Sequence, residues 1–388
     1  MNPIAKPTGA QRPGLGHRSQ SLDILRAVAI FMVMISHLHA YPGSNKAVRA
    51  VVTFLDRGGW VGVDLFFVLS GFLIAGLLFK EQSRHGAISF KSFFIRRGFK
   101  IYPAYYLMTA VTLPILAYHD QNTNVFKAAI PWLIYLQNYI YTPLGFIWGH
   151  TWSLAIEEQF YVLLPLVLIF LAKIKKSEEN PFKSIPMIFF IVAGGCFVIR
   201  LVQAVNIPFK GMIHLAPFHV RMDSLFFGVF ISYIHHYHPA VLRALAARAR
   251  FVLLGAGAIL LLPAFLFQLE ERPFIYSIGF TSFYLGSGLI LIAVLEDEPN
   301  NNFLAKTIAY IGARSYSIYL WHFPILWVAY EYLSKKWAPW FDWNWASGSY
   351  WVGATVFGVL ISNAVERPFL KLRDRLCPSR SAYPNSGI

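Results

Sequence analysis

Long apolar runs separated by short polar segments fill most of this chain. A helix needs roughly 20 mainly apolar residues to cross a hydrocarbon core of about 30 Å, and ten runs are near that length. We therefore expect an all-α polytopic membrane protein with about ten transmembrane helices. The runs lie near residues 24–41, 60–79, 101–118, 151–172, 186–205, 218–236, 251–268, 275–295, 307–333 and 349–366.

One further apolar run is too short to cross. The stretch Ile130 to Tyr141, IPWLIYLQNYIY, would extend only about 18 Å as a helix, so we expect a re-entrant or interfacial helix there. With ten crossings, most Lys and Arg residues fall on the side that holds both termini, and an eleventh crossing would lose this bias. The positive-inside rule then places both termini in the cytoplasm.

The same pattern divides the chain into three parts. Residues 1–20 form a polar cytoplasmic tail, and residues 21–369 form the ten-helix membrane domain. Residues 370–388 form a basic cytoplasmic tail. The first part lacks a short apolar core followed by a small-residue cleavage site, so no removable signal peptide is expected.

Composition agrees with a membrane protein. The chain is 56% hydrophobic, 17% aromatic and 14% charged, which is typical of polytopic proteins. Its formal net charge of +15 comes from short basic clusters between apolar runs, so we expect no nucleic-acid partner. Two cysteines, Cys196 and Cys377, give neither a disulfide framework nor the spacing of a metal site.

The first apolar run carries two ionisable residues, Arg26 and His37. They are eleven positions apart, which on a helix is about 16 Å and about three turns, so both lie near one face. Ionisable side chains in a bilayer cost roughly 2.5 to 3.5 kcal/mol and often mark function. The alternative is that Arg26 reaches the interface and His37 marks the outer end of the span.

Three more polar residues are predicted at the depth of His37, in the outer third of the membrane. Counting 1.5 Å per residue from the span ends places Asp64, Glu157 and His322 there. Each alone could be a polar group that holds helices together. Four at one depth favour chemistry or ion passage.

A basic layer is predicted at the cytoplasmic face. Arg96, Arg97 and Lys100 come just before the 101–118 run, near the level of Arg26. Such a layer suits an anion with several negative charges. Ordinary positive-inside anchoring is the alternative, and we favour it for Arg96.

Arg221 and Asp223 stand two positions apart near the outer end of their span. They line the entrance for a polar ligand, or they form a structural ion pair. The sequence alone leaves both interpretations open.

Six motifs together match a known family. The region from Leu22 to about Phe369 resembles the integral-membrane acyltransferase family 3 proteins, which O-acylate bacterial lipopolysaccharide O-antigens, exopolysaccharides, Nod factors and some macrolides. Lys100 departs from the pattern, because the family often has an arginine there. The motifs are LDILRAVAIFMVMISH, GVDLFFVLSGFLI, RRGFKIYP, WSLAIEEQFY, RMDSLFFG and SYSIYLWHFP.

The resemblance implies transfer of an acyl group, most commonly acetyl, from cytoplasmic acyl-CoA to a hydroxyl of a surface glycan or lipid-linked saccharide. It implies a bacterial inner-membrane protein in contact with lipid. Acetyl-CoA is the expected donor, and no metal is expected. Whether the protein forms a homo-oligomer is left open. The donor phosphates would lie near Arg26, Arg97 and Lys100, and the thioester would lie near His37.

The resemblance also implies roles for the outer polar residues. His37 would be the general base, and Glu157 or Asp64 would orient its imidazole. We expect Glu157 to share a helix face with Ser153 and to meet His37, while Glu158 lies off that face and reaches the outer polar surface or a neighbouring helix. The remaining candidates for binding the acceptor are Ser153, Arg221, Asp223, Tyr319 and His322.

A proton-coupled transporter is the competing class, because buried His, Asp, Glu and Arg residues also form ion pathways. The hydropathy and motifs show no inverted repeat, which favours the enzyme. A glycan-binding subunit without chemistry is a third class, and it predicts that loss of His37 has no effect.

Overall fold

The computed structural model describes residues 19–38, 45–119, 121, 123–142, 144, 148–175, 178–297, 300–329 and 343–380, and these residues form helices and turns with no strand among them. Helices occur at all ten expected runs. They are α1 (Gln20–Ile35), α2 (Lys46–Gly58), η1 (Gly59–Val61), α3 (Gly62–His85), α4 (Phe90–His119), α5 (Val125–Leu133), η2 (Gly149–Thr151), α7 (Trp152–Ile174), α8 (Ile185–Asn206), α9 (Gly211–His214), η3 (Phe218–Val220), α10 (Met222–Tyr237), α11 (Pro239–Leu266), η4 (Ile275–Gly279), α12 (Phe280–Val294), α13 (Phe303–Gly312), α14 (Ser315–Trp327), α15 (Trp343–Ile361), η6 (Ser362–Glu366) and α16 (Arg367–Leu376).

Seven helical segments of the described chain are long and apolar enough to cross a membrane. Helices α1 and α10 have 16 residues each, and the expected run at 307–333 is divided between α13 and α14. The fold is therefore that of a helical integral membrane protein, while a count of ten crossings stays a prediction.

The short run at 130–141 does not form a spanning helix. Helix α5 covers nine residues and ends at Leu133, and turns follow it. Two tyrosines of α4 hold this end in place: the hydroxyl of Tyr105 donates to the carbonyl of Trp132 at 2.8 Å, and that of Tyr106 donates to Leu133 at 2.9 Å. A helix of this length is too short to cross.

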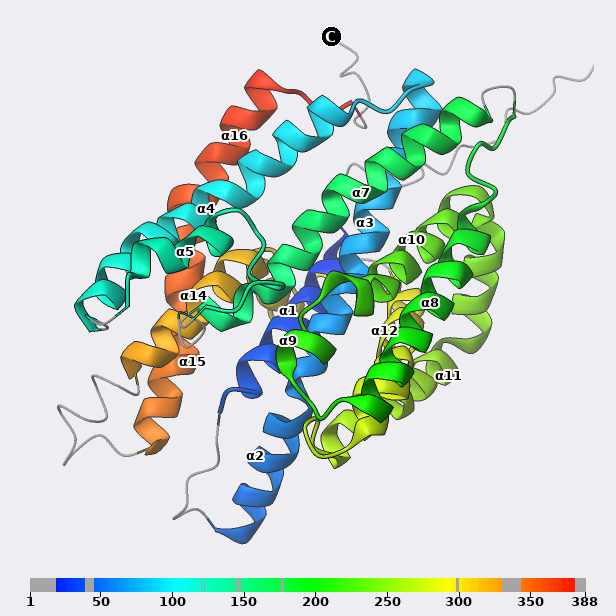
Figure 1. Cartoon of the computed structure of the whole chain (residues 1–388). Coiled ribbons are helices and arrows are strands. Elements are labelled where there is room, and N and C mark those ends of the chain that lie inside the picture. Colours follow the sequence, from blue (N-terminus) through cyan, green and yellow to red (C-terminus); the bar gives the residue numbers. More distant parts are fainter. Residues whose placement is uncertain are drawn as a thin grey trace, which may run out of the picture.

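Helix α3 is the central helix of the bundle and packs most extensively against α10, with α1, α7 and α12 also around it (Figure 1). The α3–α10 crossing depends on two glycines. A Cβ on Gly71 would lie 1.9 Å from the carbonyl oxygen of Leu225, and one on Gly228 would lie 2.1 Å from that of Val68. Small residues let membrane helices approach this closely, and the approach brings residues of α3 and of the segment before α10 into contact.

The two ends of the bundle differ. Helix α16 lies beside α4 at one end, and α2 projects from the opposite end (Figure 1). We refer to these as the α16 end and the α2 end.

Candidate active site

A cavity of about 460 Å³ lies at the α16 end, with walls from α1, α3, α4, α7, α10, α14 and α16. Its wall is strongly basic, and it includes all members of the basic layer expected from sequence. Arg26 also contacts the carboxylate of Asp23, one helical turn before it. The basic residues in the wall are Arg26, Lys80, Arg96, Arg97, Lys100, Arg373 and Arg380.

Arg97 is held by a polar network in the middle of this wall. Its guanidinium lies over the ring of Tyr161, 5.2 Å from the centroid. The hydroxyl of Tyr161 donates to Glu157 at 2.6 Å, and Ser70 Oγ lies 2.8 Å from the same hydroxyl. Because Tyr161 has one proton and gives it to the carboxylate, Ser70 is the donor in the second bond. Helices α3, α4 and α7 thus fix the place of Arg97 together.

Glu157 therefore belongs to the basic cavity. Among the described residues it makes no hydrogen bond or ion pair with His37, so the expected contact between them is wrong. Glu157 and Ser153 do share the cavity, as their spacing of one turn indicates. Glu158 reaches a neighbouring helix, as one of its two expected placements has it, because it accepts a bond from the hydroxyl of Tyr102 of α4 at 3.1 Å. It also lines the cavity, which was not expected.

Ser153, in the first turn of α7, and Tyr319, on α14, also line this cavity. Their hydroxyl oxygens lie 2.6 Å apart. Tyr319 donates to the backbone carbonyl of His150 at 2.5 Å, so the proton in the Ser153–Tyr319 bond comes from Ser153. These bonds join the cavity wall to a group of three histidines, which are His37, His150 and His322.

The imidazole of His322 is fully buried at the centre of this histidine cluster. Its ring centroid lies 5.5 Å from that of His37 and 4.8 Å from that of His150. Nδ1 of His322 contacts the carbonyl of Tyr319, and a carbonyl only accepts, so this nitrogen carries the proton. In the neutral ring, Nε2 is then the basic nitrogen, and it has no hydrogen-bond partner among the described residues.

His37 lies beyond the helix that was expected to carry it. Helix α1 ends at Ile35, and His37 follows in a turn in which Leu38 N donates to the carbonyl of Ile35 at 3.0 Å. The predicted span continued to residue 41, and the part from residue 39 lies outside the described residues. The ring of His37 packs edge-on against Phe323 with centroids 4.7 Å apart. The structure thus brings His37 and His322 together, as their predicted depths indicated.

His150 is a site residue that the sequence analysis missed. It lies in η2, directly before the WSLAIEEQFY motif, and its Nε2 donates to the carbonyl of Leu320 at 3.2 Å. Its place two residues before that motif was the available signal, but a histidine outside an apolar run has no predicted depth.

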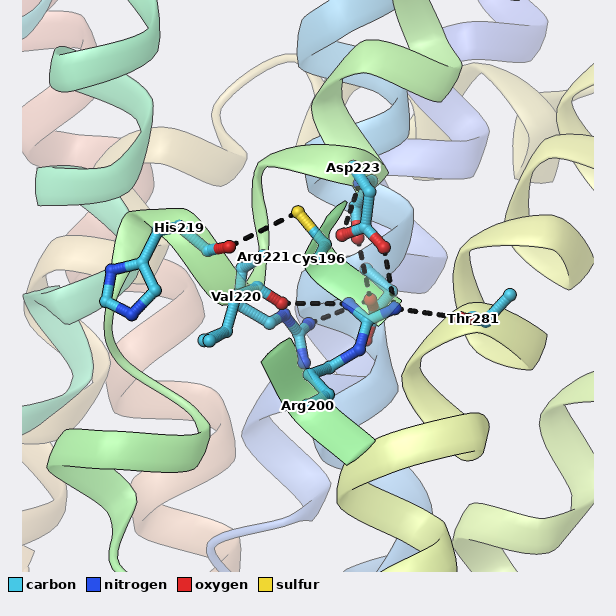
Figure 2. A network of polar contacts seen from close by, with 9 residues as sticks. Cys196, Arg200, His219, Val220, Arg221, Asp223 and Thr281 are labelled. Carbon is cyan, nitrogen blue, oxygen red and sulfur yellow. Dashed lines mark hydrogen bonds and ion pairs between the residues drawn. The ribbon is translucent and has the colours of Figure 1, made fainter. Parts of the chain in front are cut away.

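Two fully buried ion pairs are formed by Asp64, Arg200, Arg221 and Asp223, none of which lines the cavity. Figure 2 shows Arg200, Arg221 and Asp223. Arg221 donates to Asp64 at 2.8 Å, and Arg200 lies 2.8 Å from the carboxylate of Asp223. Arg200 also donates to the carbonyl of Val220 at 2.8 Å. The guanidinium of Arg221 lies 4.0 Å from the centroid of the Phe280 ring.

These pairs correct two expectations. Asp64 makes no hydrogen bond or ion pair with His37 among the described residues; its Oδ1 pairs with Arg221 instead. Arg221 and Asp223 are fully buried in the described part of the chain and do not line the basic cavity. Each pairs with a residue of another helix, and not with its neighbour two positions away. A buried charge needs an opposite charge directly beside it, which Asp64 supplies to Arg221 and Arg200 supplies to Asp223. Of the two interpretations that the sequence left open, the geometry agrees with structural ion pairs, with partners on other helices.

The fold and the site define a helical membrane protein whose basic cavity ends beside a histidine cluster. Residues 19–367 match the model of a family described as an acyltransferase domain, and the chain belongs to that family.

The chain is similar to proteins of Staphylococcus aureus. It is 30% identical over 393 residues, 93% of this chain, to a protein of strain MRSA252 that is named only provisionally as an O-acetyltransferase. It is 30% identical over 328 residues, 79% of this chain, to the O-acetyltransferase OatA of strain NCTC 8325 / PS 47. These matches span 59% and 50% of the relatives' own lengths. No solved structure matches the chain.

Proposed function

We propose that the protein is an O-acyltransferase that moves an acyl group, most commonly acetyl, from cytoplasmic acyl-CoA to a hydroxyl of a surface glycan or lipid-linked saccharide. One observation carries the proposal. The wall of a single cavity contains seven basic residues and the Ser153–Tyr319 pair. Tyr319 is hydrogen-bonded to His150, whose ring lies beside that of His322, and the ring of His322 lies beside that of His37. Membership of the acyltransferase family and the names of its relatives support the reaction class.

The donor is assigned to the basic part of the cavity. Acyl-CoA carries several phosphate charges, and arginine and lysine are the side chains that bind phosphate best. The volume of about 460 Å³ lies within the range of about 300 to 1,000 Å³ of small-molecule sites. Arg26, Arg97 and Lys100 would hold the phosphates, and the pantetheine arm would extend towards Ser153 and Tyr319. By the positive-inside rule, the α16 end would face the cytoplasm.

The chemistry is assigned to the histidine cluster. His37 takes the proton of the acceptor hydroxyl as general base, and the hydroxyl oxygen forms a bond to the thioester carbonyl carbon. The tetrahedral intermediate then loses CoA as the carbon–sulfur bond breaks, and the imidazolium returns the proton to the thiolate. The products are an O-acyl ester and free CoA. Ser153 and Tyr319 position the acceptor hydroxyl.

His322 is the second candidate for the base, because its unpaired Nε2 can accept a proton and its ring lies against that of His37. No metal is needed for either assignment, since the base and the hydroxyl donors are protein side chains.

Purified protein in lipid vesicles, given radiolabelled acetyl-CoA and a saccharide acceptor, tests the function. The proposal predicts labelled ester on the saccharide and release of one CoA thiol per ester. A proton-coupled transporter would instead move the saccharide across the vesicle membrane and leave acetyl-CoA intact. Mass analysis of surface polysaccharide from cells with and without the gene would then identify the acceptor.

A further inference from the structure

The chain after α16 folds back onto the turn between α3 and α4. We call residues 377–380 the C-terminal strap. The guanidinium of Arg96 donates to the backbone carbonyl of Cys377, and His85 Nε2 donates to the carbonyl of Arg380 at 2.8 Å. The thiol of Cys377 lies 3.3 Å from Ser92 Oγ. Three side chains of α3 and α4 thus hold the strap at the α16 end.

The strap and α16 also supply part of the cavity wall. Arg373, Ser379 and Arg380 line the same cavity as Arg97 and Lys100. Arg373 is near enough to Arg97 for the two positive charges to repel each other. The C-terminus therefore adds two cations to a cavity that the first four helices had already made basic.

Acidic residues balance only part of this charge. Asp374 pairs with Arg96 at 3.1 Å and with Arg373 at 2.8 Å, and its side chain is 55% exposed, so water screens both pairs. Arg380 pairs with the nearly buried carboxylate of Glu81 at 3.1 Å. Like charges gathered around one space cost free energy, and a bound polyanion would relieve that cost.

Glu81 can release Arg380 without losing all its hydrogen bonds. Its Oε1 also accepts a bond from the backbone N–H of Ser89 at 2.9 Å, and this bond would remain if the guanidinium turned into the cavity. Arg380 is 39% exposed, so its side chain has room to move.

We propose that the C-terminal strap is part of the donor site: Arg373 and Arg380 bind phosphate groups of acyl-CoA, and Arg380 exchanges Glu81 for a phosphate when the donor binds. The proposal rests on the proposed function and assigns the phosphate end of the donor to the last helix and the strap. It implies that a thioester without phosphates gains nothing from either arginine.

The test compares two donors with the full-length protein. Arg380→Ala should raise the KM for acetyl-CoA about tenfold, the effect of losing one charge-assisted hydrogen bond, and leave kcat unchanged. The KM for acetyl-pantetheine, which lacks phosphates, should not change. Glu81→Gln keeps an acceptor for Ser89 but frees Arg380, so it should lower the KM for acetyl-CoA.

Arg375→Ala is the matched control, because Arg375 is an exposed arginine of α16 that does not line the cavity. It should leave both KM values as in the wild type. If Arg380→Ala and Arg375→Ala have equal effects, or if acetyl-CoA and acetyl-pantetheine are affected alike, the strap is only structural and the proposal fails.

Calorimetric measurement of CoA binding distinguishes failure of the strap proposal from failure of the proposed acyltransferase function. A wild-type protein that does not bind CoA would contradict both proposals. A wild-type protein that binds CoA, with Arg380→Ala binding it equally well, would contradict the strap alone. Weaker binding of CoA by Arg380→Ala at an unchanged melting temperature would support it.

Discussion

The imidazole rings of His37, in the turn after α1, and of His322, on α14, lie with their centroids 5.5 Å apart. The proton on Nδ1 of His322 is fixed by the carbonyl of Tyr319, so its Nε2 carries the lone pair. Two candidate bases therefore lie together beyond the Ser153–Tyr319 pair. The arrangement allows either ring to take the proton of an acceptor hydroxyl.

His37→Ala should lower the acetyl-transfer rate by about 10² to 10⁴, the usual contribution of a general base, while the protein stays folded in the membrane. Single-turnover transfer from labelled acetyl-CoA measures this. The control is His119→Ala, which alters a histidine that packs on Trp327 and makes no ring contact with His37 or His322 among the described residues. Near-normal turnover in His37→Ala would remove His37 from the mechanism and leave His322 as the base.

Arg97→Ala and Lys100→Ala should each raise the KM for acetyl-CoA about tenfold with little change in the KM for the acceptor, because both cations line the donor cavity. Steady-state kinetics with each substrate varied in turn measures the split. Lys91→Ala, an exposed position on the same helix, should behave as the wild type. An effect confined to the acceptor KM would show that the cavity assignment is wrong.

Glu157→Gln should impair acetyl transfer more than Glu158→Gln does. Glu157 is a positioning residue, because it accepts the bond of Tyr161, over whose ring Arg97 lies. Its loss should therefore raise the KM for acetyl-CoA and leave the pH profile of kcat unshifted. Tyr161→Phe removes the same hydrogen bond and should reproduce the effect. A shifted pH profile in Glu157→Gln would instead show that this carboxylate takes part in the acid–base step.

Asp64→Leu should destabilise the protein by about 3 to 5 kcal/mol, because it leaves the fully buried Arg221 without its carboxylate. The double variant Asp64→Leu, Arg221→Leu should recover most of that loss, since an apolar pair replaces a buried ion pair at little cost. Thermal unfolding in detergent measures both. Loss of activity in the double variant at full stability would contradict the structural role.

Sequence predicts the helices well here because an apolar run must be helical in a membrane. Backbone groups have no water to bind there, and so all ten runs have helices at the predicted places. The depths counted from the span ends also predicted correctly that His37 and His322 lie close together. His37 lies in the turn after α1, however, and not on the helix itself.

Rotation about the helix axis was not predictable in the same way. One residue turns a helix by about 100°, so the sequence could not say which way Glu157 faces. The predicted separation in depth between Glu157 and Arg97 was also wrong, because Tyr161 contacts both. The partners of Asp64 and Asp223 depend on where α3, α8 and α10 cross, which glycines such as Gly71 set in three dimensions. The strap was also missed, because a basic tail carries no periodic signal of where it docks.

Acetyl transfer by the purified protein tests the central claim most directly. Wild-type protein in vesicles should transfer label from acetyl-CoA to a saccharide hydroxyl and release an equal amount of CoA thiol, and His37→Ala should show neither above background. Saccharide that remains unlabelled while the wild-type protein carries it across the vesicle membrane would contradict the acyltransferase account and favour a transporter.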